Sequence, residues 1–185
     1  MSRRRSSTPR ASTLKELLRS KPQRGRPRHA VSRQNVYVAL TKRQKGTIKE
    51  LSTYLPEGMA RADVPDLAIT ALAARLEALR RAVADRNREM PEGVTDLDSL
   101  YLLWDLPLPA EDPDEPKWTS IRLSPQQVIE LGRVNGTLQA LFGANRSETF
   151  SLSLALLNQW LEDYPLPHIS MTLDELRKEI VSIYL

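Results

Sequence analysis

The sequence predicts a mainly α-helical fold that contains two short β-strands. Residues 34–40 and 118–123 alternate apolar and polar side chains with the period of a half-buried strand. A helix-start signal follows each strand, and apolar residues then recur at helical spacing. The chain thus divides into a basic arm (1–33), a first strand–helix–helix copy (34–85), an acidic linker with a short helix (86–116), a second copy (117–163) and a C-terminal helix (164–185).

Charge is unevenly distributed along the 185 residues. The arm holds eleven Lys or Arg and one acid, Glu16, whereas acids outnumber bases in the remaining body. A basic arm on an acidic body indicates a polyanionic partner, with a solubilising tail as the alternative interpretation.

The absence of cysteine favours a reducing cytoplasm. No apolar run approaches the roughly 18 residues of a membrane span, so we expect neither a transmembrane helix nor a secretory signal.

The arm contains a short motif, Gln23–Arg28, in a stretch rich in Ser, Pro and Arg that we expect to be disordered in isolation. The motif resembles an AT-hook, whose Gly-Arg-Pro core lies in the minor groove of A·T-rich DNA. Gly25 would allow a close approach to the groove floor, and Pro27 would keep the chain extended. The negative potential of a narrow groove would attract the flanking arginines, although generic phosphate attraction is the alternative. The minor-groove candidates are Arg24, Gly25, Arg26, Pro27 and Arg28.

The first copy begins with a strand in which Val36, Val38 and Leu40 alternate with more polar positions. Thr41 is expected to cap the first helix, and Asp63 the second. Their apolar stripes are Ile48, Leu51 and Leu55, then Leu67, Ile69, Leu72, Leu76 and Leu79.

The second copy shows the same order more clearly. Ser124 and Pro125 suit the start of a helix, and Gln127 is expected to complete a capping box. Gly143 suits the left-handed position after that helix, and Asn145 suits the next N-cap. The first helix carries Val128, Leu131, Val134, Leu138 and Leu141; the second is expected to be buried nearly all round, through Phe150, Leu152, Leu154, Leu156, Leu157, Trp160 and Leu161.

Two further helices are predicted outside the copies. Thr95–Leu103 is expected to be a short capped helix whose Leu100, Leu103 and Trp104 pack on the body, with a partner-binding peptide as the alternative. A capping box from Thr172 to Glu175 opens a last helix that ends at Tyr184. We expect this helix to pack on its own body, with self-association as the alternative.

The segments Ile121–Pro125 and Gly143–Glu148 carry a family resemblance. In their setting of strand, capped helix, turn and buried helix, they are similar to the ribbon-helix-helix family of the Arc/MetJ type. The similarity spans Lys117–Leu161. The first copy departs from the family pattern in its longer turn, and because Asp63 and Asp66 put negative charge where the family binds a phosphate.

The resemblance implies how the two copies pair and what they contact. Members of the family dimerise, and their two strands form an antiparallel ribbon that enters the major groove of double-stranded DNA. Two copies in one chain imply a tandem ribbon-helix-helix fold, a single-chain pseudo-dimer whose one two-stranded ribbon comes from both copies. The expected base contacts are Asn35, Tyr37, Ala39, Trp118, Ser120 and Arg122, and the expected phosphate contacts are Asn145, Arg146 and Ser147.

These features predict a sequence-specific DNA-binding protein, nucleoid-associated, that acts as a monomeric pseudo-dimer or a higher oligomer. The only histidines, His29 and His168, have no nucleophile or ligand cluster near them in sequence, so we expect no catalysis, metal or cofactor. The chain resembles regulators and accessory proteins of bacterial plasmids, either for DNA transfer or for partition, where basic arms contact a ParA-type ATPase. The alternative function is an antitoxin-like or assembly-factor module that binds a protein.

Overall fold

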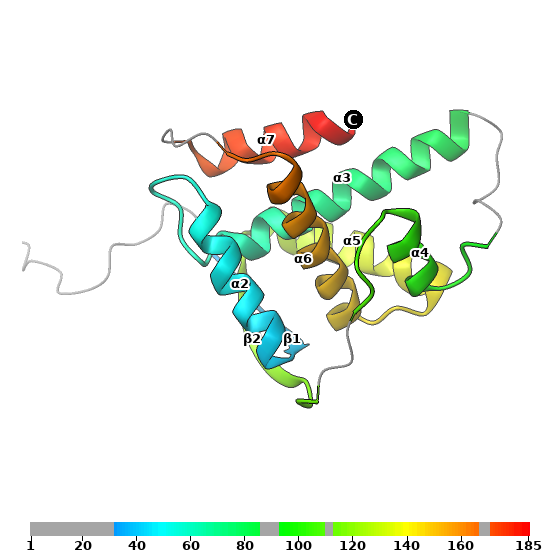
Figure 1. The fold of residues 1–185 in the computed structure, drawn as a ribbon, viewed down its shortest axis with the longest axis horizontal. Helices are drawn as coiled ribbons and strands as arrows, with labels where there is room; N and C mark the ends of the chain where they lie inside the picture. Colours follow the sequence, from blue (N-terminus) through cyan, green and yellow to red (C-terminus); the bar gives the residue numbers. More distant parts are fainter. Residues whose placement is uncertain (1–31, 86–92, 110–112, 167–170) are drawn as a thin grey trace, which may run out of the picture. The chain divides into compact units, whose positions relative to one another are not determined.

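The computed structural model describes residues 32–85, 93–109, 113–166 and 171–185 of the chain (Figure 1). This part is mainly helical and contains one two-stranded antiparallel sheet. Its elements in chain order are β1 (Gln34–Leu40), α2 (Lys42–Tyr54), α3 (Val64–Asp85), α4 (Leu97–Leu103), β2 (Lys117–Leu123), α5 (Pro125–Phe142), α6 (Arg146–Asp163) and α7 (Leu173–Tyr184).

The two strands pair with each other within the chain, which confirms the predicted antiparallel ribbon. Gln34 lies opposite Leu123 at one end and Leu40 lies opposite Lys117 at the other. One face of this ribbon, formed by β1 and β2, is buried against the helices through Val36, Val38, Leu40, Ile121 and Leu123. The strands therefore alternate as the sequence pattern required.

A strand–helix–helix order occurs twice, with nearly constant spacing. An offset of 83 residues separates Leu40 from Leu123, the last residues of the two strands, and also Lys42 from Pro125, the first residues of α2 and α5. The offset between the starts of α3 and α6 is one residue smaller, 82. The first copy combines a shorter first helix with a longer turn, so its second helix starts at almost the equivalent position.

The core is built around α6, which packs mainly on α3. Phe150 and Leu157 are fully buried and Leu154 is 3% exposed, which confirms the predicted burial of this helix. The helix α7 packs on α3, so the C-terminal helix lies on its own body as expected. Leu141, the last residue of the apolar spacing in α5, is 53% exposed, because it lies in the last turn of α5, beyond the buried residues of that helix.

The segment between the copies also contributes to the core. Leu100 and Trp104 are buried as expected, but Leu103 is 38% exposed, because α4 turns Leu100 and Tyr101 inward instead. Asp96, one residue after the expected cap, is the N-cap. The side-chain amide of Gln159 on α6 donates to the carbonyls of Trp104 and Asp105, both at 3.3 Å. This contact attaches the segment that follows α4 to α6.

Most helix starts are capped as predicted. Capping boxes are present at Thr41 with Gln44, Asn145 with Glu148, and Thr172 with Glu175, and Gly143 is left-handed with φ 70°. The capping box predicted at Ser124 is wrong. The Ser124 amide, which Gln127 would have to bind, donates instead to the Asp66 carboxylate at 2.9 Å.

Asp63 occupies the predicted cap position of the second helix, because its backbone carbonyl accepts from the Leu67 amide at 3.1 Å. It lies just before α3, and its carboxylate accepts from the Ala60 amide and from the Arg33 guanidinium. The Asp63 carboxylate therefore stabilises the turn before α3 in two ways: it binds an amide of the turn itself, and it links the turn to Arg33, the residue that precedes β1.

Candidate nucleic-acid interface

The six side chains predicted to contact bases lie together on the face of the ribbon that the helices leave uncovered. They form three directly opposed pairs, Asn35 with Arg122, Tyr37 with Ser120, and Ala39 with Trp118. Ala39 is half-buried and the other five are exposed, with Trp118 76% and Tyr37 61% accessible. The structure thus brings residues about 80 positions apart in sequence onto one surface.

The register of the ribbon matches the sequence repeat. Tyr37 and Ser120 are separated by 83 residues, the same offset that relates the two strand ends, and they lie opposite each other. The centre of the ribbon is therefore the point at which equivalent positions of the two copies meet. Asn35 is equivalent to Trp118, and Ala39 to Arg122, so the two halves of this face have the same backbone arrangement but different side chains.

The exposed ribbon face suits contacts with base edges in its chemistry. None of its six side chains is acidic, and the Arg122 guanidinium offers five N–H donors. Asn35 offers both a donor and an acceptor, and Tyr37 and Ser120 carry hydroxyl groups. Arginine binds the O6 and N7 acceptors of guanine together, and asparagine pairs in the same manner with adenine. Trp118 lies at the end of the ribbon, and its partner is the small Ala39.

The predicted phosphate-binding turn joins α6 to the ribbon. The Asn145 side chain accepts from the amides of Ser147 and Glu148 at 2.8 and 3.1 Å. The Ser147 hydroxyl accepts from the Ala39 amide at 2.8 Å. Because a hydroxyl both accepts and donates, its proton remains a donor toward an anion. Arg146 is exposed beside it.

A buried charge cluster closes the opposite end of the ribbon. Asp66 is fully buried and accepts from the Ser124 amide and from Arg177 of α7, both at 2.9 Å. Arg33 lies 3.6 Å from the same carboxylate and also binds Asp63. Burial raises the pKa of Asp66, and the Ser124 amide, Arg177 and Arg33 oppose that shift. We call these five residues the Asp66 cluster.

The Asp66 cluster changes the interpretation of the first copy. The sequence suggested that Asp63 and Asp66 place negative charge where a phosphate would bind. In the structure, Asp66 is inaccessible and both acids are bonded to arginines. The two carboxylates are thus paired with arginines within the protein. The start of α3 is occupied by these arginines and by the Ser124 amide.

Several predicted residues lie outside the described part of the chain. These are the AT-hook-like segment, including Arg24, Gly25, Arg26, Pro27 and Arg28, together with His29 and His168. The arm is described only at its last two residues, Ser32 and Arg33. Arg33 is half-buried and its guanidinium is bound to Asp63 of the body.

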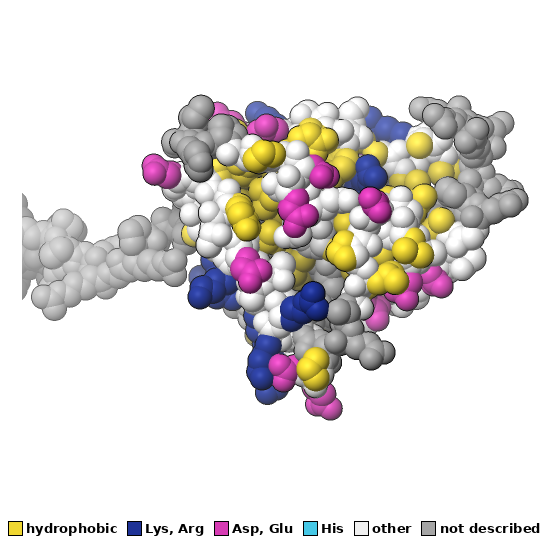
Figure 2. Space-filling view, in the orientation of Figure 1, with side chains coloured by type: hydrophobic (Ala, Val, Ile, Leu, Met, Phe, Trp, Pro, Cys, Tyr) yellow, Lys and Arg dark blue, Asp and Glu magenta, His cyan; other side chains and the backbone are white. Residues whose placement is uncertain are grey.

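Two groups of residues were not singled out from the sequence. Arg33 and Arg177 are 144 positions apart and meet only through Asp66, so no local pattern could have indicated their contact. Lys42, Lys45 and Lys49 on α2 do carry a signal, because their i, i+3, i+7 spacing places them along one side of a helix. Figure 2 shows Lys and Arg side chains over α2 at the lower left of the view.

Comparison with models of protein families, with curated proteins and with solved structures gives no match to this chain. Among the described helices, none combines the length and apolar character needed to cross a membrane.

Proposed function

We propose that this protein binds double-stranded DNA sequence-specifically, as a tandem ribbon-helix-helix pseudo-dimer that inserts β1 and β2 into the major groove. The observation that carries the proposal is the antiparallel ribbon centred on the repeat-equivalent pair Tyr37 and Ser120. A two-stranded ribbon fits the major groove, which is about 12 Å wide. The six side chains on its uncovered face would then contact the base edges.

The parts of the chain would contribute differently to binding. Arg122 and Asn35 would recognise neighbouring bases, because they are directly opposed and the Cβ atoms of such pairs lie about 5 Å apart. Arg146 and the Ser147 hydroxyl would bind a phosphate and fix the position of the ribbon. The arm would add electrostatic affinity along the duplex. A regulator or a plasmid accessory factor for transfer or partition would use these contacts.

The decisive experiment is selection of bound duplexes from a randomised pool, followed by sequencing. We expect a defined preferred site without two-fold symmetry, because the two halves of the ribbon face carry different side chains. The variant Arg122→Ala should lose the preference at one base pair of that site. Recovery of unenriched sequences by the wild-type protein would contradict the proposal.

A second function is favoured by one observation, the exposure of Tyr37 and Trp118. Exposed aromatic side chains are enriched in protein–protein interfaces, and two of them lie on this single face. An antitoxin-like or assembly-factor module would use the ribbon face to bind a protein. In that case Tyr37→Ala and Trp118→Ala would abolish capture of a protein partner, and no duplex would be enriched.

A further inference from the structure

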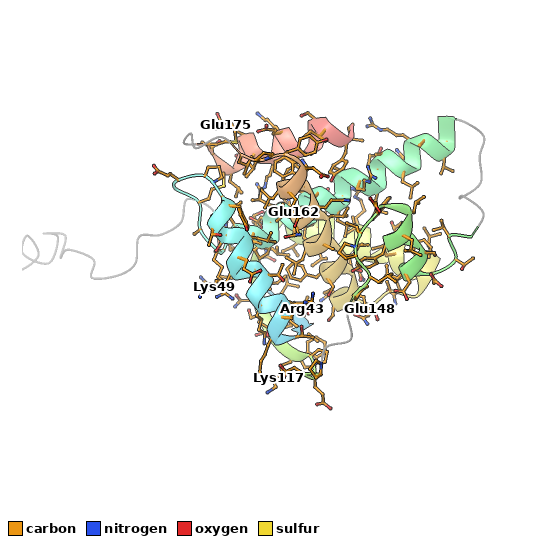
Figure 3. All side chains as sticks on the ribbon, in the orientation of Figure 1. Arg43, Lys49, Lys117, Glu148, Glu162 and Glu175 are labelled. Atoms are coloured by element: carbon orange, nitrogen blue, oxygen red, sulfur yellow. The ribbon has the colours of Figure 1, made fainter. Side chains whose placement is uncertain are left out.

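The helix α2 carries a row of positive charge that the proposed ribbon contacts do not use. Lys42, Lys45 and Lys49 recur along one side of it, whereas Ile48 and Leu51 face the core. Lys42 and Lys49 are exposed and Lys45 is half-buried. We call these three lysines the basic stripe. Figure 3 labels Lys49 on α2 and Lys117 near the foot of the ribbon.

The equivalent helix of the second copy has no such row. At the offset of 83 residues the three positions are Pro125, Val128 and Gly132, none of which is charged. The arginine of α5 that follows them, Arg133, is paired with Glu130 at 2.8 Å. The two helices that follow the two strands therefore differ in charge, although they occupy equivalent places in the repeat.

Contacts between elements place the start of the basic stripe at one end of the ribbon. Lys42 comes two residues after Leu40, which lies opposite Lys117 at the last position of the ribbon. The side-chain amide of Gln44 donates to the Ser151 hydroxyl of α6 at 2.7 Å. Because Ser147 of the same helix binds the Ala39 amide, the starts of α2 and α6 both lie beside the Ala39–Trp118 pair.

At the other end of the ribbon, Arg122 is exposed on the outer face and Arg61 is exposed in the turn before α3, but the described residues there form no row of lysines like the basic stripe. There Leu123 leads into Ser124, whose amide is bound by the buried Asp66. The arginines of the Asp66 cluster form ion pairs within the protein, Arg33 with Asp63 and Arg177 with Asp66. Within the described part of the chain, a row of lysines thus lies at the Ala39–Trp118 end and not at the Arg122 end.

We propose that the basic stripe is a second DNA contact, which binds phosphates beside the Ala39–Trp118 end of the inserted ribbon and leaves the Arg122 end without an equivalent contact. This inference rests on the proposed function. From Lys42 to Lys49 the stripe extends about 10 Å along α2, long enough to follow the backbone of one strand. Lys42 pairs with Asp114 at 3.0 Å, but exposed pairs of this kind contribute little and exchange readily for a phosphate.

The first test compares two charge-matched variants of the full chain on the duplex obtained by selection. In K42Q/K45Q/K49Q the stripe is removed; in R80Q/R81Q/K178Q three exposed cations of α3 and α7 are removed instead. Each phosphate contact contributes about 0.9 to the slope of log affinity against log salt. We expect the slope to fall by about 2 to 3 in the stripe variant and to stay nearly unchanged in the control. Equal slopes for the two variants would overturn the inference.

The second test is phosphate ethylation interference on the same duplex. Wild-type protein should be sensitive to ethylation of phosphates on one side of the ribbon contact, and the stripe variant should lose that sensitivity while it retains the preferred site. Symmetrical interference in the wild type would also overturn the inference, although the proposed function would stand. If the wild-type protein selects no duplex, the proposed function itself fails, and the inference fails with it.

Discussion

The first prediction separates two contributions to DNA binding: salt-dependent affinity from the arm and base discrimination from the ribbon. The structure fixes where the arm must be cut, because Arg33 binds Asp63 and Asp66 within the body. Deletion of residues 1–33 would disturb the Asp66 cluster as well as remove charge. Deletion of residues 1–31 leaves Arg33 in place and removes ten Lys or Arg and one Glu, a net loss of nine positive charges.

The two perturbations should change different quantities. At about 0.9 per phosphate, loss of nine charges lowers the salt slope by several units, up to about eight when every charge meets a phosphate. The preferred site should survive the deletion, because only base edges in the major groove distinguish all four base pairs. Arg122→Ala should lower the slope by at most about one, yet weaken discrimination at one base pair by about 1–3 kcal/mol.

The assay is a series of binding isotherms over several salt concentrations, on the selected duplex and on a scrambled duplex. Asn35→Ala is an informative companion, because Asn35 lies opposite Arg122 in the ribbon. It should weaken the sequence preference at a base pair adjacent to the one that Arg122 is proposed to recognise. If the arm deletion abolished the site preference while Arg122→Ala changed nothing, recognition would lie in the arm, and the ribbon face would become a protein-binding surface.

Three further predictions concern the body of the protein. Leu154→Ala should lower the free energy of unfolding by about 2–5 kcal/mol, whereas Ile129→Ala, at a position 65% exposed, should change it by less than about 0.5 kcal/mol; equal effects in urea denaturation would show that α6 is not the centre of the core. Ser147→Ala leaves the part-buried Ala39 amide without its acceptor and should cost about 1 kcal/mol, and an unchanged melting temperature would argue against that hydrogen bond. The last prediction concerns Asp66, whose pKa in the folded state is raised above the ordinary 3.8. The contribution of Asp66 to stability is therefore fully present below pH 3.8 and is lost as the pH rises through the folded-state pKa. The free energy of unfolding of the wild type minus that of Asp66→Asn should therefore decrease from about pH 3.5 to pH 7, and a flat or rising difference would contradict the assignment.

Local patterns predicted most of the secondary structure. Alternation in β1 and β2, the capping residues Thr41 and Asn145, and the left-handed Gly143 all act within a few residues, so the sequence alone suffices to place them. The burial of α6 was also predictable, because apolar residues occur on all sides of it. The intrachain pairing of the strands followed from the repeat and was confirmed by the register of the ribbon.

The failure of the capping box at Ser124 has a physical cause, competition from residues distant in sequence. Ser124 and Gln127 have the residue types and the spacing of a capping box, but Asp66 takes the Ser124 amide and Arg177 donates to its hydroxyl. Those competitors lie 58 and 53 residues away. Gln127 is consequently buried with its side-chain oxygen unpaired among the described residues. For the candidate site, the sequence placed all six ribbon-face residues together, but the basic stripe was not singled out, although its i, i+3, i+7 spacing is visible in the sequence.

The side chains of the ribbon face show what two different strands allow. In two of the three pairings on this face a large aromatic lies opposite a small residue, Tyr37 opposite Ser120 and Trp118 opposite Ala39. A ribbon of two identical strands would place the residue at its centre against its own copy, so a pairing of a large with a small side chain, such as Tyr37 with Ser120, could not occur there. Two copies in one chain remove that restriction, because each strand carries its own sequence. For the same reason the first copy can bury Asp66 and carry lysines on α2, while the second copy has an exposed turn at Asn145. A protein built in this way is suited to a target whose two halves differ.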